Sequence, residues 1–483
     1  MGNRRVALTR CSSSSKRRRG SSYWVPDLPE DVVNQIGWRV LAGDDGGILD
    51  FVRFRAVCRH WRYSTASPNG RGIADRRFHP RRWIMLPEGH NLHPGHGKLR
   101  GFIRFLNLTT GAIVRVHLPL FRDHCALDSV DGILLLQRDG DTAIRLLHPF
   151  TGDIAEFPPL DTLLPYVAHP LFMRNKWRCL RCVNAASIST TNDDNKTISL
   201  TMRLFGMVRV VFAAQGDKQW RLSTWPMQPD DHLSPLSFQG KIYVLRRLPN
   251  HGGDHQEILQ IDPPQRTTTT MELSLPPPKL IAKCPAKSFH LVQCGEDIMV
   301  ITLDFTHYPQ MLVYRLSDLV LGIMVPVTCI GCDYSLFLGN RNLCVSSKAF
   351  PTIVGGTIVF YHNSECYLAR YHIRSGTLSP KSDSDFIVRS KMSSPTGIIQ
   401  HIYTCCFPSY WNKGHLASRR EPNQWRVKRK WRHGVSLASG VIILFEHLLF
   451  FSSTTIRRSL QLIDILLIIG FFPNIKVICY LQS

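Results

Sequence analysis

The hydrophobic and polar positions change their period along the chain. Between Trp24 and Pro68 apolar residues recur at helical spacing, whereas from Trp83 onward short apolar runs alternate with turns rich in Gly, Pro, Asp and Thr. Helical spacing gathers side chains on one helix face, and short runs between turn residues are typical of strands. The pattern predicts a small helical unit followed by an all-β domain.

The first predicted helix begins near Asp27. Asp27 and Glu30 have the spacing of a capping box, and Pro29 is tolerated in a first helical turn. The apolar positions that follow are Val32, Val33, Ile36, Val40 and Leu41. The glycines from Gly43 to Gly47 end this helix.

A second helical segment follows the glycine break. Its apolar residues Phe54, Val57, Cys58 and Trp61 fall at i, i+3, i+4 and i+7, which predicts one helical face. About 45 residues in three short helices bury little surface alone, so we expect an apolar stripe to remain for a partner. The alternative is an N-terminal helical cap on the following domain.

This segment resembles a known family. The phrases LPEDVV and RFRAVC, with Ile36, Leu41 and Trp61, are similar to the F-box, the module that binds the Skp-type adaptor of cullin-based ubiquitin ligases. The resemblance implies adaptor contacts at Leu28, Pro29, Val32, Ile36, Phe54, Val57, Cys58 and Trp61. Val32 and Val33 stand where the family often has Leu, a change that should weaken packing without abolishing it.

The β region repeats two kinds of glycine turn. Residues 105–119 (FLNLTTGAIVRVHLP) are similar to residues 146–160 (LLHPFTGDIAEFPPL), with a weaker echo at 371–380. A second turn feeds an apolar strand in DGILLL, QGKIYVL, GEDIMVI and GGTIVFY. Two turn types that recur in a fixed order, with steps near 40 to 60 residues between units, are typical of four-stranded propeller blades.

We expect about six blades, with a closing strand from residues 402–407. The predicted blades lie near residues 84–119, 125–160, 200–228, 236–278, 288–326 and 346–380. The alternative is a β-sandwich, in which turn signals also recur. The fold class is therefore predicted as α+β multidomain, with a three-helix F-box before the propeller.

Longer phrases in this region strengthen the resemblance. LLHPFTG, PLSFQGKIY, FLGNRNLCVS, AFPTIVGGTIVF and YWNKG are similar to plant F-box proteins with a kelch-like propeller, long catalogued as a domain of unknown function. The similarity covers roughly residues 24–432. It implies an adaptor and, through it, a cullin as partners, with the propeller holding an unidentified target protein.

The net charge of +23 gathers at two segments. Residues 1–22 carry seven Lys and Arg without an acid, and residues 413–433 carry eight against Glu421, so together they supply 14 of the 23 charges. Such segments attract nucleic acid or anionic lipid, although we do not favour nucleic acid as a partner. The alternative function is a non-ligase protein that binds nucleic acid through these basic segments or a membrane through its apolar tail. Lys16 to Arg19 has the density of a nuclear-localisation patch, and we expect the nucleus, the cytoplasm or both.

The C-terminus departs from the propeller pattern. We divide the chain into a disordered basic start (1–22), the F-box (24–68), the propeller (83–410), a basic segment (411–433) and an atypical hydrophobic tail (434–483). The apolar runs in residues 435–482 are short or interrupted by polar residues, so a membrane anchor is possible but not favoured.

The sequence shows no catalytic constellation. It has no phosphate loop, nucleophile elbow or HExxH motif, so we expect no enzyme activity and no cofactor. The 14 cysteines follow no secretory signal, so we expect reduced thiols. The CxxC pairs Cys179/Cys182 and Cys329/Cys332 lie 150 residues apart, so we do not favour zinc and interpret them as core residues and strand turns. Three histidines, His90, His93 and His96, follow one another at intervals of three residues. We interpret them as part of a solvent-exposed loop rather than as zinc ligands.

Overall fold

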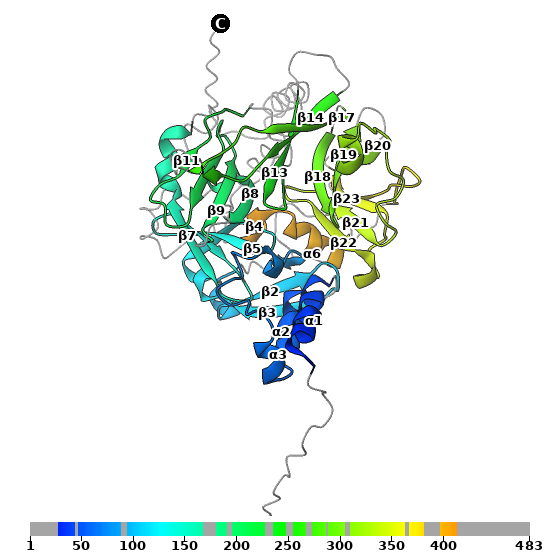
Figure 1. Cartoon of the computed structure of the whole chain (residues 1–483). Helices are drawn as coiled ribbons and strands as arrows, with labels where there is room; N and C mark the ends of the chain where they lie inside the picture. Colours follow the sequence, from blue (N-terminus) through cyan, green and yellow to red (C-terminus); the bar gives the residue numbers. More distant parts are fainter. Residues whose placement is uncertain are drawn as a thin grey trace, which may run out of the picture.

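The computed structural model joins a helical unit to a six-bladed β-propeller (Figure 1). It describes residues 28–43, 47–87, 94–167, 180–190, 196–227, 235–247, 255–266, 273–285, 288–304, 310–362, 367–380 and 397–412. The six-bladed ring behind N-terminal helices confirms the predicted order of the two folds. The basic segments and the hydrophobic tail lie outside the described residues.

The helical unit contains α1 (Glu30–Ala42), α2 (Ile48–Arg55) and α3 (Arg59–Tyr63). Two details of the prediction are wrong. The N-cap of α1 is Pro29, and no side chain caps the helix there, so the capping box does not form. The segment from Phe54 to Trp61 is not one helix, because α2 ends before Ala56 and Cys58 caps α3; Val57 therefore lies between two helices.

Each blade is an antiparallel sheet, with one parallel pair in blade 6. Blades 1 and 2 comprise β1 (Trp83–Met85), β2 (Phe102–Asn107) and β3 (Ile113–His117), then β4 (His124–Val130), β5 (Ile133–Arg138), β6 (Ala143–Leu147) and β7 (Ile154–Pro159). Blade 3 comprises β8 (Val183–Thr190), β9 (Ile198–Leu204), β10 (Val211–Ala214) and β11 (Arg221–Leu222).

The remaining blades follow in chain order. Blade 4 comprises β12 (Leu236–Phe238), β13 (Lys241–Arg246), β14 (His255–Ile261) and β17 (Lys279–Pro285), with a separate hairpin of β15 (Gln265–Arg266) and β16 (Leu273–Ser274). Blade 5 comprises β18 (Ser288–Cys294), β19 (Asp297–Asp304) and β20 (Gln310–Arg315). Blade 6 comprises β21 (Tyr334–Phe337), β22 (Leu343–Ser346), β23 (Thr357–His362), β24 (Tyr367–His372) and β25 (Thr377–Leu378).

Short helices precede, connect or follow these strands. They are η1 (Arg76–Phe78), η2 (Gly97–Leu99), η3 (Pro119–Arg122), η4 (Leu160–Tyr166), α5 (Leu316–Val320), η6 (Ser347–Ala349), α6 (Ile398–Cys405) and η8 (Pro408–Trp411). Among the described helices, none is both long and apolar enough to cross a membrane.

The recurring glycine turns have the predicted role. In the first hairpins of blades 2 and 4, the turn residue and its glycine both have positive φ, at 49° and 84° for Asp131 and Gly132. Two central residues of positive φ favour a type I′ turn, which suits the twist of a tight hairpin. Gly152, in the second kind of turn, has φ 77°. Glycine adopts this region without the steric penalty that a Cβ brings.

Three strand predictions are wrong at blade boundaries. Blade 3 begins at β8 rather than near residue 200. The prediction missed β8 because no glycine turn precedes this strand. Blade 4 continues to Pro285 rather than 278. Blade 6 begins with β21 rather than near residue 346, and β21 pairs in parallel with β23.

The predicted closing strand at residues 402–407 is also wrong. Residues 402–405 are the second half of α6, whose buried residues include Ile402 and Cys405, an i, i+3 pair on one helix face. These residues join a core cluster with Leu106 of blade 1 and Val345 of blade 6. The segment therefore bridges the first and last blades as a helix.

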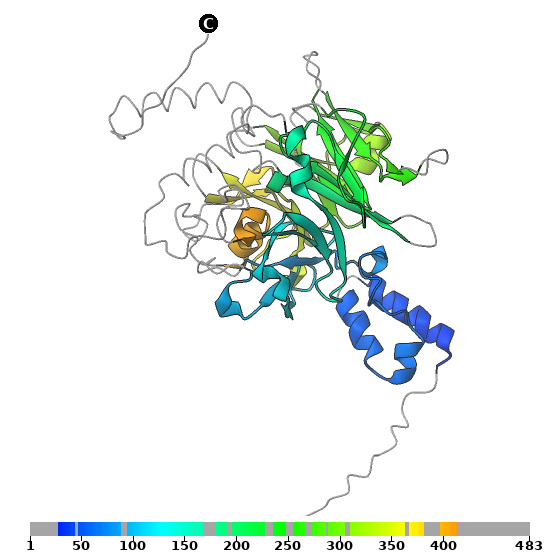
Figure 2. The ribbon, with the colours of Figure 1, turned by 90° about the vertical axis from the view of Figure 1, so that its left-hand side faces the viewer.

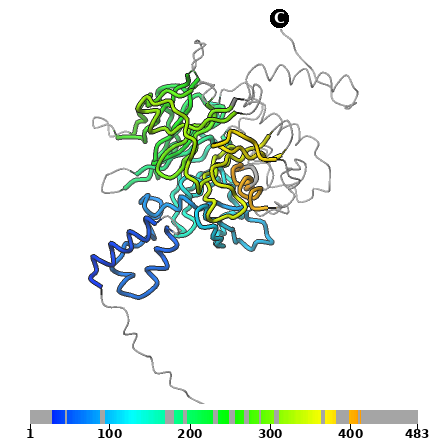
Figure 3. The backbone as a smooth tube through the Cα atoms, turned by 90° about the vertical axis from the view of Figure 1, so that its right-hand side faces the viewer, coloured from blue at the N-terminus to red at the C-terminus, as the bar shows by residue number. Residues whose placement is uncertain are grey.

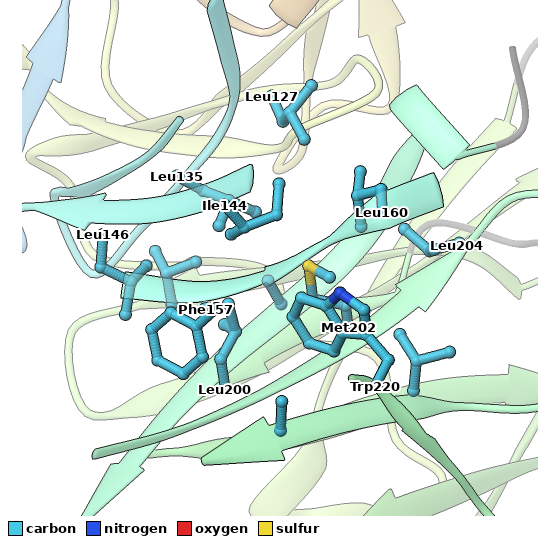
Figure 4. Packing of buried hydrophobic residues seen from close by; sticks show 14 of the residues in the cluster. Leu127, Leu135, Ile144, Leu146, Phe157, Leu160, Leu200, Met202, Leu204 and Trp220 are labelled. Atoms are coloured by element: carbon cyan, nitrogen blue, oxygen red, sulfur yellow. The ribbon is translucent and has the colours of Figure 1, made fainter. Parts of the chain in front are cut away.

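The core lies between the blades, as the alternating apolar strands require. Figure 4 shows the cluster between blades 2 and 3, where Phe157 stacks on Trp220 at a centroid distance of 6.3 Å. The indole N–H of Trp220 donates to the backbone oxygen of Pro158 at 3.0 Å. Burial of each such side chain contributes about 1.5–3 kcal/mol, and the hydrogen bond satisfies its one polar atom.

Candidate protein-interaction site

One apolar face of the helical unit packs toward the propeller. Its buried residues are Val33, Gly37, Leu41, Ile48 and Phe51. The connector is the segment between α3 and β1, residues 64–82. The rings of Phe51 and Trp38 each lie 5.8 Å from the ring of Phe78 in this connector, and the Arg77 guanidinium lies 4.1 Å from the Trp38 ring centroid. This aromatic cluster attaches the helices to the ring.

The connector is fixed on the third hairpin turn of blade 2, between β6 and β7. The Asp153 carboxylate accepts from the backbone N–H groups of Gly70 at 2.9 Å and Gly72 at 2.7 Å. His148 Nε2 lies 3.0 Å from the Phe78 backbone oxygen, while Nδ1 accepts from the N–H of Thr151 at 3.0 Å. Burial lowers the pKa of His148 to about 4, so its ring is neutral and donates from Nε2 at neutral pH.

The connector also contacts the first hairpin turn of blade 2. Asp131 Oδ2 lies 3.7 Å from His79 Nδ1 and 3.8 Å from Arg76 Nη2. Burial alone would raise the pKa of Asp131, but the neighbouring His79, Arg81 and Arg76 leave that pKa lowered. Both anchoring turns therefore lie on one face of the ring, the face that carries the helical unit.

A second apolar face of the helical unit stays outside this core. We define the apolar stripe as the eight predicted adaptor contacts. On α1, Pro29, Val32 and Ile36 follow a 3–4 spacing one position before the buried Val33 and Gly37. Pro29 is exposed, Val32 and Ile36 are half-buried, and none of the eight belongs to the buried core.

The structure brings the remaining stripe residues together around α3. The rings of Phe54 and Trp61 stack at a centroid distance of 4.4 Å, and the Cys58 Sγ accepts from the Trp61 N–H at 3.4 Å. His60 Nε2 lies 2.8 Å from the Leu28 backbone oxygen, which holds the start of α1 against α3. Val57 is 55% exposed between α2 and α3.

Sequence reasoning missed two exposed apolar residues on the same unit. Tyr63 at the end of α3 is 82% exposed, and Val52 on α2 is 43% exposed. Helical periodicity identifies a face but not which of two apolar faces is covered. The sequence signal for an exposed apolar residue is a position such as Tyr63, which lies beyond the last residue of the helical repeat.

The opposite face of the ring carries α6. His401 Nε2 lies 2.9 Å from the Pro87 backbone oxygen, and the Arg341 N–H donates to the Cys406 oxygen at 2.9 Å. Figures 2 and 3 show α6, in orange, on the other side of the ring from the blue helices. β7 and β11 also end on this side, because successive strands of a blade alternate in direction.

The thiols and imidazoles weighed for metal binding do not assemble a site in the described part of the chain. No group of three His, Cys, Asp or Glu side chains there has metal-binding geometry. His90, His93 and Cys179 lie outside the described residues. Cys405 and Cys406 are buried free thiols, as expected. Cys329 and Cys332 are exposed, which corrects their interpretation as core residues.

These features define a six-bladed β-propeller with an anchored helical unit, an architecture suited to protein interaction. Comparison with known protein families matches residues 105–388 to the KIB1-4 beta-propeller, and the chain belongs to this family. The match begins within β2 and does not include the helical unit. No curated protein matches the chain.

Proposed function

We propose that this protein is the substrate-recognition subunit of a Skp–cullin–F-box ubiquitin ligase. The helical unit binds the Skp-type adaptor, and the propeller binds a target protein. This arrangement is the one implied by the plant kelch-like F-box proteins that the sequence resembles. The protein itself performs no chemistry in this proposal, because ubiquitin transfer belongs to other subunits.

One observation carries the proposal. The eight residues of the apolar stripe lie outside the buried core, whereas the adjacent residues of α1 and α2 pack against Phe78. A cap whose only role is to cover the propeller needs one apolar face. A second, half-exposed face with the aromatic pair Phe54 and Trp61 is suited to a partner, because buried aromatic anchors carry much of the energy of an interface.

The two faces of the ring support the division of labour. The connector fixes the helical unit beside the hairpin turns, through Asp153 and His148. α6 lies on the other face, and in this proposal that face binds the target. A rigid link between the two sites raises the effective concentration of a bound target at the ligase.

The cleanest test uses the exposed position between α2 and α3. Val57→Asp introduces a charge where the side chain is already 55% exposed, so the fold should persist. We expect adaptor affinity to fall by about tenfold or more, equivalent to about 1.4 kcal/mol, because a charge is desolvated in the interface. Val208→Asp, at a propeller position that is 45% exposed, is the matched control and should bind the adaptor normally.

A second variant covers the other end of the stripe. Alanine at Leu28, Pro29 and Trp61 together should abolish adaptor pull-down, with circular dichroism confirming the fold. Adaptor binding of wild-type strength in both this variant and Val57→Asp would exclude the ligase proposal.

A further inference from the structure

Two exposed cysteines lie together on the connection between blades 5 and 6. The Sγ atoms of Cys329 and Cys332 are 3.9 Å apart, and both residues are exposed. The N–H of Gly331 donates to Cys329 Sγ at 3.3 Å. Two thiols in contact need only a small movement to form a disulfide, and their exposure admits a small oxidant.

The backbone around the pair holds this geometry. Ile330, between the two cysteines, is buried in the core between blades 5 and 6. Gly331 has φ 100°, and a Cβ there would lie 3.0 Å from the ring of Tyr334. A Cβ at Gly355 would lie 1.9 Å from the Cys332 backbone oxygen. The pair is therefore fixed to the ring by a buried anchor and close backbone contacts.

The pair is on the face of the ring that carries the helical unit. Cys294, at the end of β18 beside the first hairpin turn of blade 5, donates to the Ile330 oxygen at 3.8 Å. The corresponding turns of blades 4 and 5 meet through Gln239 and Glu296, whose side chains lie 3.5 Å apart. The dithiol thus lies apart from the face that the proposed function leaves for a target.

Metal binding does not account for the pair within the described residues. No third His, Cys, Asp or Glu there completes a metal site with Cys329 and Cys332. The nearby Asp333 carboxylate is paired with Lys348 Nζ at 2.8 Å. Structural zinc requires four ligands, whereas thiol–disulfide exchange requires only two cysteines.

We propose that Cys329 and Cys332 form a redox-active dithiol, oxidised to an intramolecular disulfide by low-molecular-weight disulfides of the glutathione class. The Cys329 thiolate attacks one sulfur of the small disulfide, forms a mixed disulfide and releases one small thiolate. The Cys332 thiolate then attacks Cys329 Sγ and releases the second. The two thiol protons go to the two released thiolates, so the protein loses two electrons and the small disulfide gains them.

The order of attack follows from the surroundings of the two sulfurs. The hydrogen bond and the charge of Cys329 raise the pKa of Cys332, so Cys332 stays protonated at neutral pH and suits the second, resolving step. The Gly331 N–H donates to the Cys329 Sγ, which holds this sulfur in place for the first attack. In a reducing compartment such oxidation is transient, which is the usual role of intracellular disulfides.

A second pair of cysteines provides an internal comparison. The Sγ atoms of Cys294 and Cys344 are 3.2 Å apart, and Cys294 is only 8% exposed. If the distance between the sulfur atoms alone decided which pair is oxidised, Cys294 and Cys344 would react first. Access of the oxidant to the thiols favours Cys329 and Cys332 instead. We expect only the exposed pair to react.

The test is disulfide mapping of the purified full chain after incubation with oxidised glutathione, alkylation under denaturing conditions and mass spectrometry. We expect Cys329 and Cys332 to be joined and protected from alkylation, to recover with dithiothreitol, and Cys294 and Cys344 to stay alkylated. Full alkylation of Cys329 and Cys332, or a disulfide between Cys294 and Cys344 instead, would overturn the proposal.

A variant separates the two steps. Cys332→Ser removes the resolving thiol, so a glutathione adduct should accumulate on Cys329. Cys182→Ser, elsewhere in the chain, is the control and should still form the disulfide. Phenylarsine oxide, which binds two adjacent thiols, should bind the native chain and lose affinity in Cys332→Ser but not in the control; equal binding to both variants would contradict a paired dithiol.

Discussion

The side-chain amide of Asn412 bonds both backbone groups of Ala126, 286 positions earlier in the chain. Its Oδ1 accepts from the Ala126 N–H at 2.9 Å, and its Nδ2 donates to the Ala126 oxygen at 2.7 Å. Blade 1 has three strands, and Trp411 packs with Trp83 and Met85 of β1. The Asn412 side chain thus makes the two hydrogen bonds with β4 that the backbone of a neighbouring strand would otherwise make.

Asn412→Ala should destabilise the propeller by about 2–3 kcal/mol, because two buried backbone groups lose their partner. The measurement is the midpoint of urea unfolding. Asn34→Ala, the same substitution at a half-buried position of α1, should have little effect on the unfolding midpoint. An equal midpoint for Asn412→Ala and wild type would show that the amide does not hold the ring.

Gly132→Ala should destabilise the chain more than Gly152→Ala. Both glycines have positive φ, so alanine strains each by about 1–3 kcal/mol. A Cβ at Gly132 would also lie 2.1 Å from the Pro80 oxygen, whereas nothing lies within 4 Å of one at Gly152. Limited proteolysis of the connector should accelerate only in Gly132→Ala. Equal unfolding midpoints and equal cleavage rates would argue against close packing of the connector.

Stability should fall as pH falls from about 6.5 toward 4. Burial lowers the pKa values of His148 and His290 to about 4, so the unfolded chain binds protons that the folded chain does not. The stabilisation is complete above pH 6.5. In His148→Gln, about half of this pH dependence should remain, as measured by urea unfolding at pH 7.5 and 5. An unchanged pH dependence would show that His148 titrates normally.

Arg341→Met should destabilise the chain by about 3 kcal/mol, because Arg341 pairs with the buried Asp128 carboxylate at 3.2 Å. Burial raises the pKa of Asp128 against the opposing charge of Arg341. Asp128→Asn should recover part of the loss, since the amide carries no unpaired charge. Additive effects of the two substitutions in a double-mutant cycle would contradict their pairing.

The glycine turns made most of the fold predictable. Gly132 and Gly152 mark hairpins because their positive φ leaves few alternatives to glycine. Strands without such a turn were harder to find: β8 begins without one, and β21 pairs in parallel. Residues 402–407 combine aromatic and β-branched residues that favour a strand, but burial of Ile402 and Cys405 on one face favours a helix.

The stripe was predictable as a set of residues but not as a surface. The spacing from Phe54 to Trp61 is helical even though the chain breaks at Val57, so the sequence pattern hid the break. Which α1 face packs on the ring depends on Phe78, a residue in the connector with no periodic signal. The contact of Cys329 with Cys332 follows from a turn at Gly331 that a CxxC spacing alone does not define.

The bridging position of α6 has a consequence during translation. Leu108 of blade 1 and Ile398 of α6 share one core cluster but are 290 positions apart (398 − 108). At about 5–20 residues per second, the ribosome needs roughly 15–60 s to make the intervening chain. Throughout that time the nascent first blade lacks its apolar cover, which makes it a natural client for chaperones until residue 412 has emerged.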